Sequence, residues 1–259
     1  MPDIDARIAA AMAAREEGRY ADALVLQQAL FTQAERQEAT GESPYFMAMF
    51  GLQMLLPVHP PTHAAVQIMR DDQVRRLLQG ERHFGVPVWE GGKRPQRFAV
   101  IVELNDLIGD AESTCVLFVR FDESDPVQAR QYAGRALPAL VACGAWALAE
   151  RYRGDPLAWL ADCNALAYTF PLFPPPRAAP RLAATLMNLV REVYMGAAVL
   201  DGLGNAPAAL ALRAALIDGI EGEVMRDLAQ RELAAPGTIS RELVAHQMAQ
   251  EHPSAGTGK

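Results

Sequence analysis

The sequence predicts an all-α protein, because three features of its 259 residues favour helices. Apolar residues make up 51% of the chain, and much of that share is alanine and leucine. These side chains lose little conformational entropy in a helix, whereas a sheet protein would need more β-branched residues. Apolar positions also recur with helical spacing, and residues that start or stop helices lie between these stretches. We therefore expect a run of paired antiparallel helices.

Proline and glycine mark the ends of these helices. Ser43-Pro44, Asp125-Pro126 and Asp155-Pro156 each place a capping side chain before a proline suited to the first helical position, and Asn205 can cap in the same way. Glycine follows several apolar stretches, at the position where a helix ends in a left-handed residue. The glycines expected to stop helices are Gly18, Gly80, Gly109, Gly144 and Gly204.

These signals divide the chain into helices, loops and a tail. The predicted helices span residues 3–17, 20–38, 44–56, 61–79, 96–108, 110–122, 126–142, 145–153, 156–169, 179–203, 206–218, 220–234 and 239–251. Glycine and proline gather in residues 81–95 and 171–180, which we expect to be loops. Residues 252–259 are expected to form a disordered tail. The prediction is one helical-repeat domain over residues 1–251, interrupted by the two loops.

One short pattern recurs at the turns between helices. Gly18, Tyr20 and Ala23 have the same spacing as Gly144, Trp146 and Ala149, and weaker copies begin at Gly109 and Gly204. The glycine allows a sharp turn, the aromatic residue fills the wedge beside the turn, and the small residue lets the second helix approach the first.

This pattern resembles the tetratricopeptide repeat, whose helix-turn-helix unit carries a Gly-x-Tyr-x-x-Ala core across its turn. Gly109 and Gly144 lie 35 residues apart, close to the 34-residue period of that family. Other intervals are not multiples of it, and the family's tryptophan, Leu-Gly pair and closing proline are not regularly present. The resemblance implies a tetratricopeptide-like α-α superhelix, with an irregular helical bundle as the alternative. It also implies partner binding in a concave groove, and it carries no catalytic residues across.

Five polar or aromatic residues are candidates for that groove: Arg97, Asn105, Asn188, Arg191 and Trp89. Asn105 lies within an apolar stripe, where its amide is expected to hydrogen-bond a backbone group of the next hairpin or of a bound peptide. Arg191 either faces the groove or forms an ion pair between helices. Trp89 lies in a glycine-rich loop, and packing back onto the helices is the favoured interpretation.

Other residue clusters have simpler interpretations. His59 and His63 are spaced as zinc ligands on a helix, with His83 as a third candidate, but Pro60 and Pro61 separate the first two, so we expect no metal site. Asp106 and Asp110 lie one turn apart and are expected to be solvated. The aromatic and methionine residues Tyr45, Phe46, Met47, Met49 and Met54 are expected to be core. Cys115, Cys143 and Cys163 are expected to be buried thiols in a reducing compartment.

Charge and missing motifs limit the function classes. The net charge is −7, and no lysine–arginine cluster suits nucleic acid. No apolar run has membrane-spanning length, so we expect a soluble cytoplasmic protein. Motifs for phosphate binding or nucleophilic catalysis are absent, so neither a cofactor nor catalysis is expected.

We interpret the chain as a protein–protein interaction module for a dedicated partner, as a bacterial immunity protein, chaperone or adaptor would be. The negative charge would suit a basic partner. One alternative is a helical enzyme or small-ligand receptor with a pocket between hairpins near Asn105, Trp146 and Asn188. Another is a self-associating structural subunit.

Overall fold

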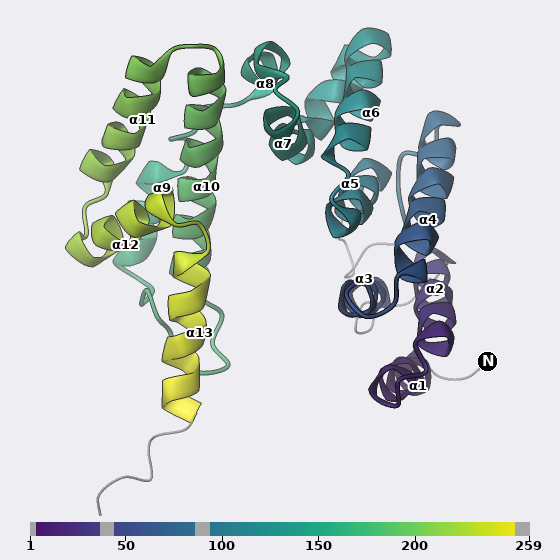
Figure 1. Cartoon of the computed structure of the whole chain (residues 1–259). Coiled ribbons are helices and arrows are strands. Elements are labelled where there is room, and N and C mark those ends of the chain that lie inside the picture. Colours follow the sequence, from purple (N-terminus) through teal and green to yellow (C-terminus); the bar gives the residue numbers. More distant parts are fainter. Residues whose placement is uncertain (1–3, 37–43, 86–93, 252–259) are drawn as a thin grey trace, which may run out of the picture. The chain divides into compact units, whose positions relative to one another are not determined.

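The computed structural model describes residues 4–36, 44–85 and 94–251 (Figure 1). Regular secondary structure in these residues is helical, apart from an isolated β-bridge between His83 and Gln96. The described helices are α1 (Ile4–Glu16), α2 (Tyr20–Arg36), α3 (Pro44–Leu55), α4 (Pro61–Leu78), α5 (Arg97–Ile108), α6 (Ala111–Ser124), α7 (Pro126–Ala142), α8 (Trp146–Tyr152), α9 (Leu160–Ala167), α10 (Arg181–Gly202), α11 (Ala206–Gly219), α12 (Glu223–Ala234) and α13 (Thr238–Glu251).

Each predicted helix is present, and capping side chains explain the starts of α6, α7 and α11. The carboxylate of Asp110 accepts a hydrogen bond from the Ser113 backbone N–H at 3.0 Å, and Asn205 and Asp125 cap α11 and α7 in the same way. The largest difference concerns α9, which begins at Leu160 because the residues after Asp155 form a turn. Ser43 lies outside the described residues.

The turn signature is confirmed at all four of its copies. The predicted stop glycines all have positive φ, between 69° and 95°, which side chains other than glycine rarely tolerate. The residue five positions after each repeat glycine is buried, with at most 1% of its surface exposed. These residues are Ala23, Thr114, Ala149 and Ala209. Close packing at these positions therefore fixes each hairpin.

The chain forms two compact units, unit 1 (residues 1–139) and unit 2 (residues 140–259). The single domain predicted over residues 1–251 stays a prediction. Many helix pairs that follow one another in sequence pack together, as expected for hairpins; α1 with α2, α2 with α3, α4 with α5 and α10 with α11 are examples.

Unit 1 contains two rows of helices (Figure 1). Helix α1 packs against α2 and α3, and α3 also contacts α5, so α1, α3 and α5 form one row. Helix α2 packs against α3, and α4 packs against α5. The core between the rows includes Leu30, Phe31, Leu52, Val66 and Leu104. Successive helices from α1 to α5 therefore alternate between the two rows. Unit 1 has one side lined by α1, α3 and α5 and another lined by α2 and α4.

Unit 2 is organised around the long helix α10. This helix contacts α8, α9, α11, α12 and α13, whereas a helix of a regular repeat array contacts only its neighbours in the stack. Its buried face includes Leu182, Leu186, Leu189 and Val193. Near its end, Gly202 leaves room for the Trp146 ring, since a Cβ there would lie 2.2 Å from it. Unit 2 therefore has the contact pattern of a bundle.

The segment 171–180 is not helical, as predicted. The prediction of three buried thiols is wrong, because Cys163 is buried but Cys143 is exposed. Burial raises the pKa of the Cys163 thiol to about 11. Among the described residues, no helix combines the length and the apolar character needed to span a membrane. The tail 252–259 lies outside the described residues.

Candidate functional site

The outer face of α3 carries exposed apolar side chains on a helix without charge. Pro44–Leu55 contains no acidic or basic residue, and Ala48, Leu52 and Leu55 are buried. Phe46, Phe50 and Met54 follow one another every four residues and therefore share one side of the helix. Their exposed fractions are 64%, 45% and 40%, and the two phenylalanine rings stack at 6.3 Å between centroids. We call these three residues the α3 face.

A shallow pocket lies on one side of the α3 face, between α3 and α5. Its volume is about 390 Å³, and it is lined by Phe46, Met49, Phe50, Gln53, Glu103, Asp106 and Leu107. Both charged residues among these are acidic and lie on α5. The Tyr45 hydroxyl donates to the Glu103 carboxylate, and Arg135 lies 3.9 Å from it. We call this depression the α3–α5 pocket; its walls are apolar and its edge is negative.

A narrower crevice lies on the other side, between α1 and α3. It has room for about 20 Å³ and is lined by Ile8, Ala11, Met12, Arg15, Gln27, Leu30, Met47, Phe50, Gly51 and Met54. Gln27 is 6% exposed, and its Oε1 accepts no hydrogen bond from any described residue. Gly51 makes space for that amide, since a Cβ there would lie 2.0 Å from Nε2. We call this depression the α1–α3 crevice.

The prediction that the aromatic and methionine residues of this segment are core is wrong for Phe46 and Met54. Tyr45, Met47 and Met49 are partly buried. A 12-residue helix that is apolar on all sides must expose one side unless another element covers it. The four-residue spacing of Phe46, Phe50 and Met54 was the available signal. Which side stays uncovered depends on the position of α1 and α5, which the spacing does not reveal.

Arg97, a predicted groove residue, lies instead at the centre of a buried polar cluster. It is 2% exposed and forms an ion pair with Glu35 of α2 at 2.5 Å. Its guanidinium also donates to Gln73 of α4 and to the backbone carbonyls of Glu81 and His83. We call this set of contacts the Arg97 cluster. It joins α2, α4, α5 and the segment after α4.

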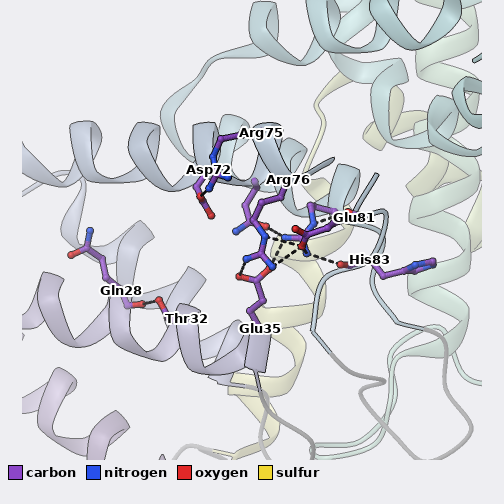
Figure 2. Close-up of polar contacts among 10 residues, drawn as sticks. Gln28, Thr32, Glu35, Asp72, Arg75, Arg76, Glu81 and His83 are labelled. Carbon is purple, nitrogen blue, oxygen red and sulfur yellow. Dashed lines mark hydrogen bonds and ion pairs between the residues drawn. The ribbon is translucent and has the colours of Figure 1, made fainter. Parts of the chain in front are cut away.

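A second guanidinium, that of Arg76, completes the Arg97 cluster, and Figure 2 shows it beside Glu35 and Glu81. Arg76 lies 2.6 Å from Glu35 and 2.7 Å from Glu81, so each carboxylate contacts both arginines. The hydrogen bond from Arg76 is the main reason why the pKa of Glu81 is lowered. The neighbouring pocket between α2 and α4, of about 520 Å³, is lined by both acidic and basic residues. Since these charges pair with one another, the cluster is suited to holding helices together rather than to proton transfer.

Asn105, another predicted groove residue, is completely buried in a second network. Its Oδ1 accepts a hydrogen bond from Arg70 of α4 at 2.5 Å, and its Nδ2 donates to Thr114 of α6 at 2.8 Å. We expected a backbone partner, but both partners are side chains. Arg70 also forms an ion pair with Asp110 at 2.8 Å. The amide therefore links α4, α5 and α6.

Asp110 is not the solvated carboxylate that the sequence suggested. Desolvation alone would raise its pKa, but hydrogen bonds from Arg70 and Ser113 outweigh this effect and lower the pKa to about 2. In the unfolded chain an aspartate has a pKa of about 3.9. The ionised form is thus favoured by folding, and its contribution to stability is present above pH ~4 and is lost as the pH falls towards 2.

This shift predicts a pH dependence that Asp110→Asn should remove. Asparagine keeps the helix cap but not the ion pair. At pH 7 the variant should be less stable than the wild type by about 1–2 kcal/mol, allowing for partial exposure of the carboxylate. At pH 2 the difference should approach zero. Urea unfolding of both proteins at pH 7 and at pH 2 measures this difference in stability. A difference that is the same at both pH values would contradict the lowered pKa of Asp110.

The remaining predicted residues lie elsewhere. Asn188 and Arg191 are exposed on α10 of unit 2, and Arg191 forms no ion pair with another described residue. Trp89 lies outside the described residues. His59 precedes α4, as predicted, and its Nδ1 lies 3.1 Å from the Thr62 hydroxyl. In the described part of the chain, no three His, Cys, Asp or Glu side chains form a metal-binding group. Partner contact by the five candidate residues stays a prediction.

No family model, curated protein or solved structure matches this chain. The α3 face, with the α3–α5 pocket and the α1–α3 crevice beside it, is therefore assigned as the candidate site from its own geometry.

Proposed function

We propose that this chain is a non-catalytic protein-interaction module whose unit 1 binds a helical segment of a partner protein on the α3 face. In this proposal the hairpins of unit 1 stack as a tetratricopeptide-like superhelix. The first helix of each hairpin then lines the groove, which makes α1, α3 and α5 the binding row.

The observation that supports the proposal most is the exposed apolar stripe on α3. Phe46, Phe50 and Met54 together present two aromatic rings and a flexible thioether to solvent, on the row that the repeat resemblance assigns to the groove. Exposed apolar patches flanked by polar groups mark interaction sites in many proteins. Methionine-rich surfaces adapt to the shape of a bound helix. Depressions on both sides of the stripe can receive side chains of that helix.

The charge at the site favours a basic segment. Glu103 and Asp106 line the α3–α5 pocket, and the chain has a net charge of −7. An amphipathic helix binds a groove through apolar residues spaced by three or four positions, and its flanking charges select the partner. We therefore propose an amphipathic helix with lysine or arginine beside its apolar face as the occupant.

Two model peptides test this proposal. One is a helix of about 18 residues with leucine on one face and lysine on the other; the second carries glutamate in place of lysine. We expect the basic peptide to bind the full chain at least about tenfold more tightly, in fluorescence anisotropy at physiological ionic strength. Phe50→Asp should weaken its binding about 30-fold or more, as loss of a central apolar contact does.

Replacing Phe50 by aspartate distinguishes binding through the apolar α3 face from purely electrostatic binding of the basic peptide. A merely electrostatic interaction would become stronger, since Phe50→Asp adds a negative charge. Val127→Asp adds the same charge at a side chain that is 74% exposed on α7, and it should leave the affinity unchanged. Equal binding of both peptides, or an unchanged affinity in Phe50→Asp, would contradict the proposal. If light scattering shows a dimer that Phe50→Asp dissociates, the occupant is a second copy and the proposed partner class is wrong.

A further inference from the structure

We infer that Glu103 receives an arginine side chain of the bound helix in the α3–α5 pocket and disfavours lysine there, with Tyr45 as the residue that positions its carboxylate. The inference rests on the proposed function, since it specifies which basic side chain the partner presents to unit 1 and which residue recognises it.

Tyr45 fixes the direction of the Glu103 carboxylate. Its hydroxyl donates a hydrogen bond to Oε2 of Glu103 and so joins α3 to α5. The Tyr45 ring packs against Phe31 and Phe84, with centroids 6.0 and 5.3 Å away, and this packing holds the hydroxyl in place. Burial, and next the charge of Glu103, raise the pKa of Tyr45, so the phenol stays protonated as a donor. Glu103 therefore contributes a carboxylate of fixed orientation to the pocket that it lines.

The second oxygen of Glu103 can accept a cation from a partner. This Oε1 lies 3.9 Å from the guanidinium of Arg135 on α7, which is beyond hydrogen-bond distance. The Arg135 side chain is 62% exposed, and ion pairs at such sites are weak, so a closer cation can replace it. Asp106 lies three positions after Glu103, on the same side of α5, and adds a second negative charge to the pocket. The two carboxylates therefore attract a cation, whichever basic side chain carries it.

The walls of the pocket distinguish arginine from lysine. The rings of Phe46 and Phe50 are within 11° of parallel, and both are exposed. A planar guanidinium stacks on aromatic rings, and it gives up its hydration more easily than an ammonium group does. Met49 and Leu107 complete the apolar lining and suit the aliphatic part of the side chain. The walls therefore favour the more weakly hydrated cation.

The shape of the guanidinium gives arginine a further advantage. Its parallel N–H donors form a forked contact with one carboxylate, whereas an ammonium acts as a point charge. Each carboxylate oxygen accepts more than one hydrogen bond, so the Tyr45 contact leaves room for this fork at Glu103. The pocket volume of about 390 Å³ lies within the range of ligand pockets, about 300–1,000 Å³. One side chain can therefore enter without any opening of the walls.

Two peptides of equal charge test the inference on the full chain. The first is the basic peptide with lysine on its polar face, and the second carries arginine at the same positions. We expect the arginine peptide to bind at least about fivefold more tightly in fluorescence anisotropy at physiological ionic strength, because it adds the forked contact and the ring stacking. Equal affinities of the two peptides would overturn the inference and leave the proposed function intact.

Three variants show whether Glu103 and Tyr45 cause the preference. Glu103→Gln keeps the shape of the side chain and removes its charge, so the ratio of the two affinities should fall below about twofold. Glu123→Gln removes the same charge from an exposed residue of α6 that does not line the pocket, and it should leave the ratio unchanged. Tyr45→Phe keeps the ring and removes the donor, so it should lower the ratio while the lysine peptide binds as before.

The ratio of the two affinities separates the possible outcomes. An arginine preference that survives in Glu103→Gln would overturn the inference, because the arginine would then bind at another residue. A Tyr45→Phe variant that weakens both peptides equally would show a merely structural role and overturn the positioning role of Tyr45. Absence of binding by both peptides would overturn the proposed function, and this inference with it.

Discussion

Arg97→Ala is expected to lower the free energy of unfolding of unit 1 by about 3–5 kcal/mol, the range found when one partner of a buried ion pair is removed. The substitution leaves Glu35 with Arg76 alone and removes the donors for Gln73 and for two backbone carbonyls. It also removes the guanidinium that lies 5.9 Å from the centre of the Phe84 ring. Few surface substitutions approach this effect.

Two other substitutions separate burial from charge. Arg97→Lys keeps the charge but cannot form the forked contacts, so it should recover only part of the loss. Arg82→Ala removes an arginine that is 56% exposed and pairs with Asp125 at 3.2 Å, and it should cost less than about 1 kcal/mol. Urea unfolding followed by circular dichroism gives the overall change, and hydrogen exchange of α4 and α5 amides assigns it to unit 1. A loss below about 1 kcal/mol for Arg97→Ala would show that the Arg97 cluster does not hold these helices together.

Asn105→Ala is expected to destabilise unit 1 by about 2–3 kcal/mol. The Thr114 hydroxyl loses its amide donor, Arg70 loses one acceptor, and a small cavity forms between α4, α5 and α6. Asn188→Ala is a matched control, because Asn188 is exposed on α10, and it should change stability by less than about 0.5 kcal/mol. Urea unfolding measures the stability of both variants. Equal losses of stability in Asn105→Ala and Asn188→Ala would show that the Asn105 amide does not hold α4, α5 and α6 together.

The buried contacts of Arg97 and Asn105 also bear on the proposed function. The Arg97 cluster and the Asn105 network are built around two of the five residues that the sequence predicted for a groove. Their contacts are within unit 1 and hold its two rows of helices together. We therefore propose the exposed apolar side chains of α3, and not these two residues, for contact with a partner.

The helices and their turns could be predicted from the sequence because their causes are local. Asp125-Pro126 starts α7 and Gly109 ends α5 through contacts within a few residues. The small residue five positions after each repeat glycine also follows from local spacing. Such signals indicate where an element begins and ends.

Burial could not be predicted for the same residues, because it depends on distant parts of the chain. Glu35 and Arg97 are 62 residues apart, and Arg70 and Asn105 are 35 apart. A basic residue two positions after Pro95 is typical of an exposed loop, yet Arg97 follows the bridge between His83 and Gln96 and is buried. In α3 the reverse holds, since Phe46 is typical of a core residue and is 64% exposed.

The division into two units was also not visible in the sequence. The turn signature occurs in both units, at Gly18 and Gly109 in unit 1 and at Gly144 and Gly204 in unit 2. Helix α10, however, has 22 residues and contacts five other helices. Unit 2 therefore packs as a bundle around α10 and not as a stack of hairpins. The repeat pattern therefore describes hairpins well and their assembly less well.

Methionine methyl groups provide the most direct test that the α3 face is the binding surface. The chain has ten methionines, distributed over both units. On addition of the basic amphipathic peptide to the full chain, the methyl signals of Met12, Met47, Met49 and Met54 should shift in NMR spectra. Those of Met69 on α4 and of Met187 and Met225 in unit 2 should stay unchanged. Shifts confined to unit 2, or none at the four α3-side methionines while the peptide binds, would contradict the account.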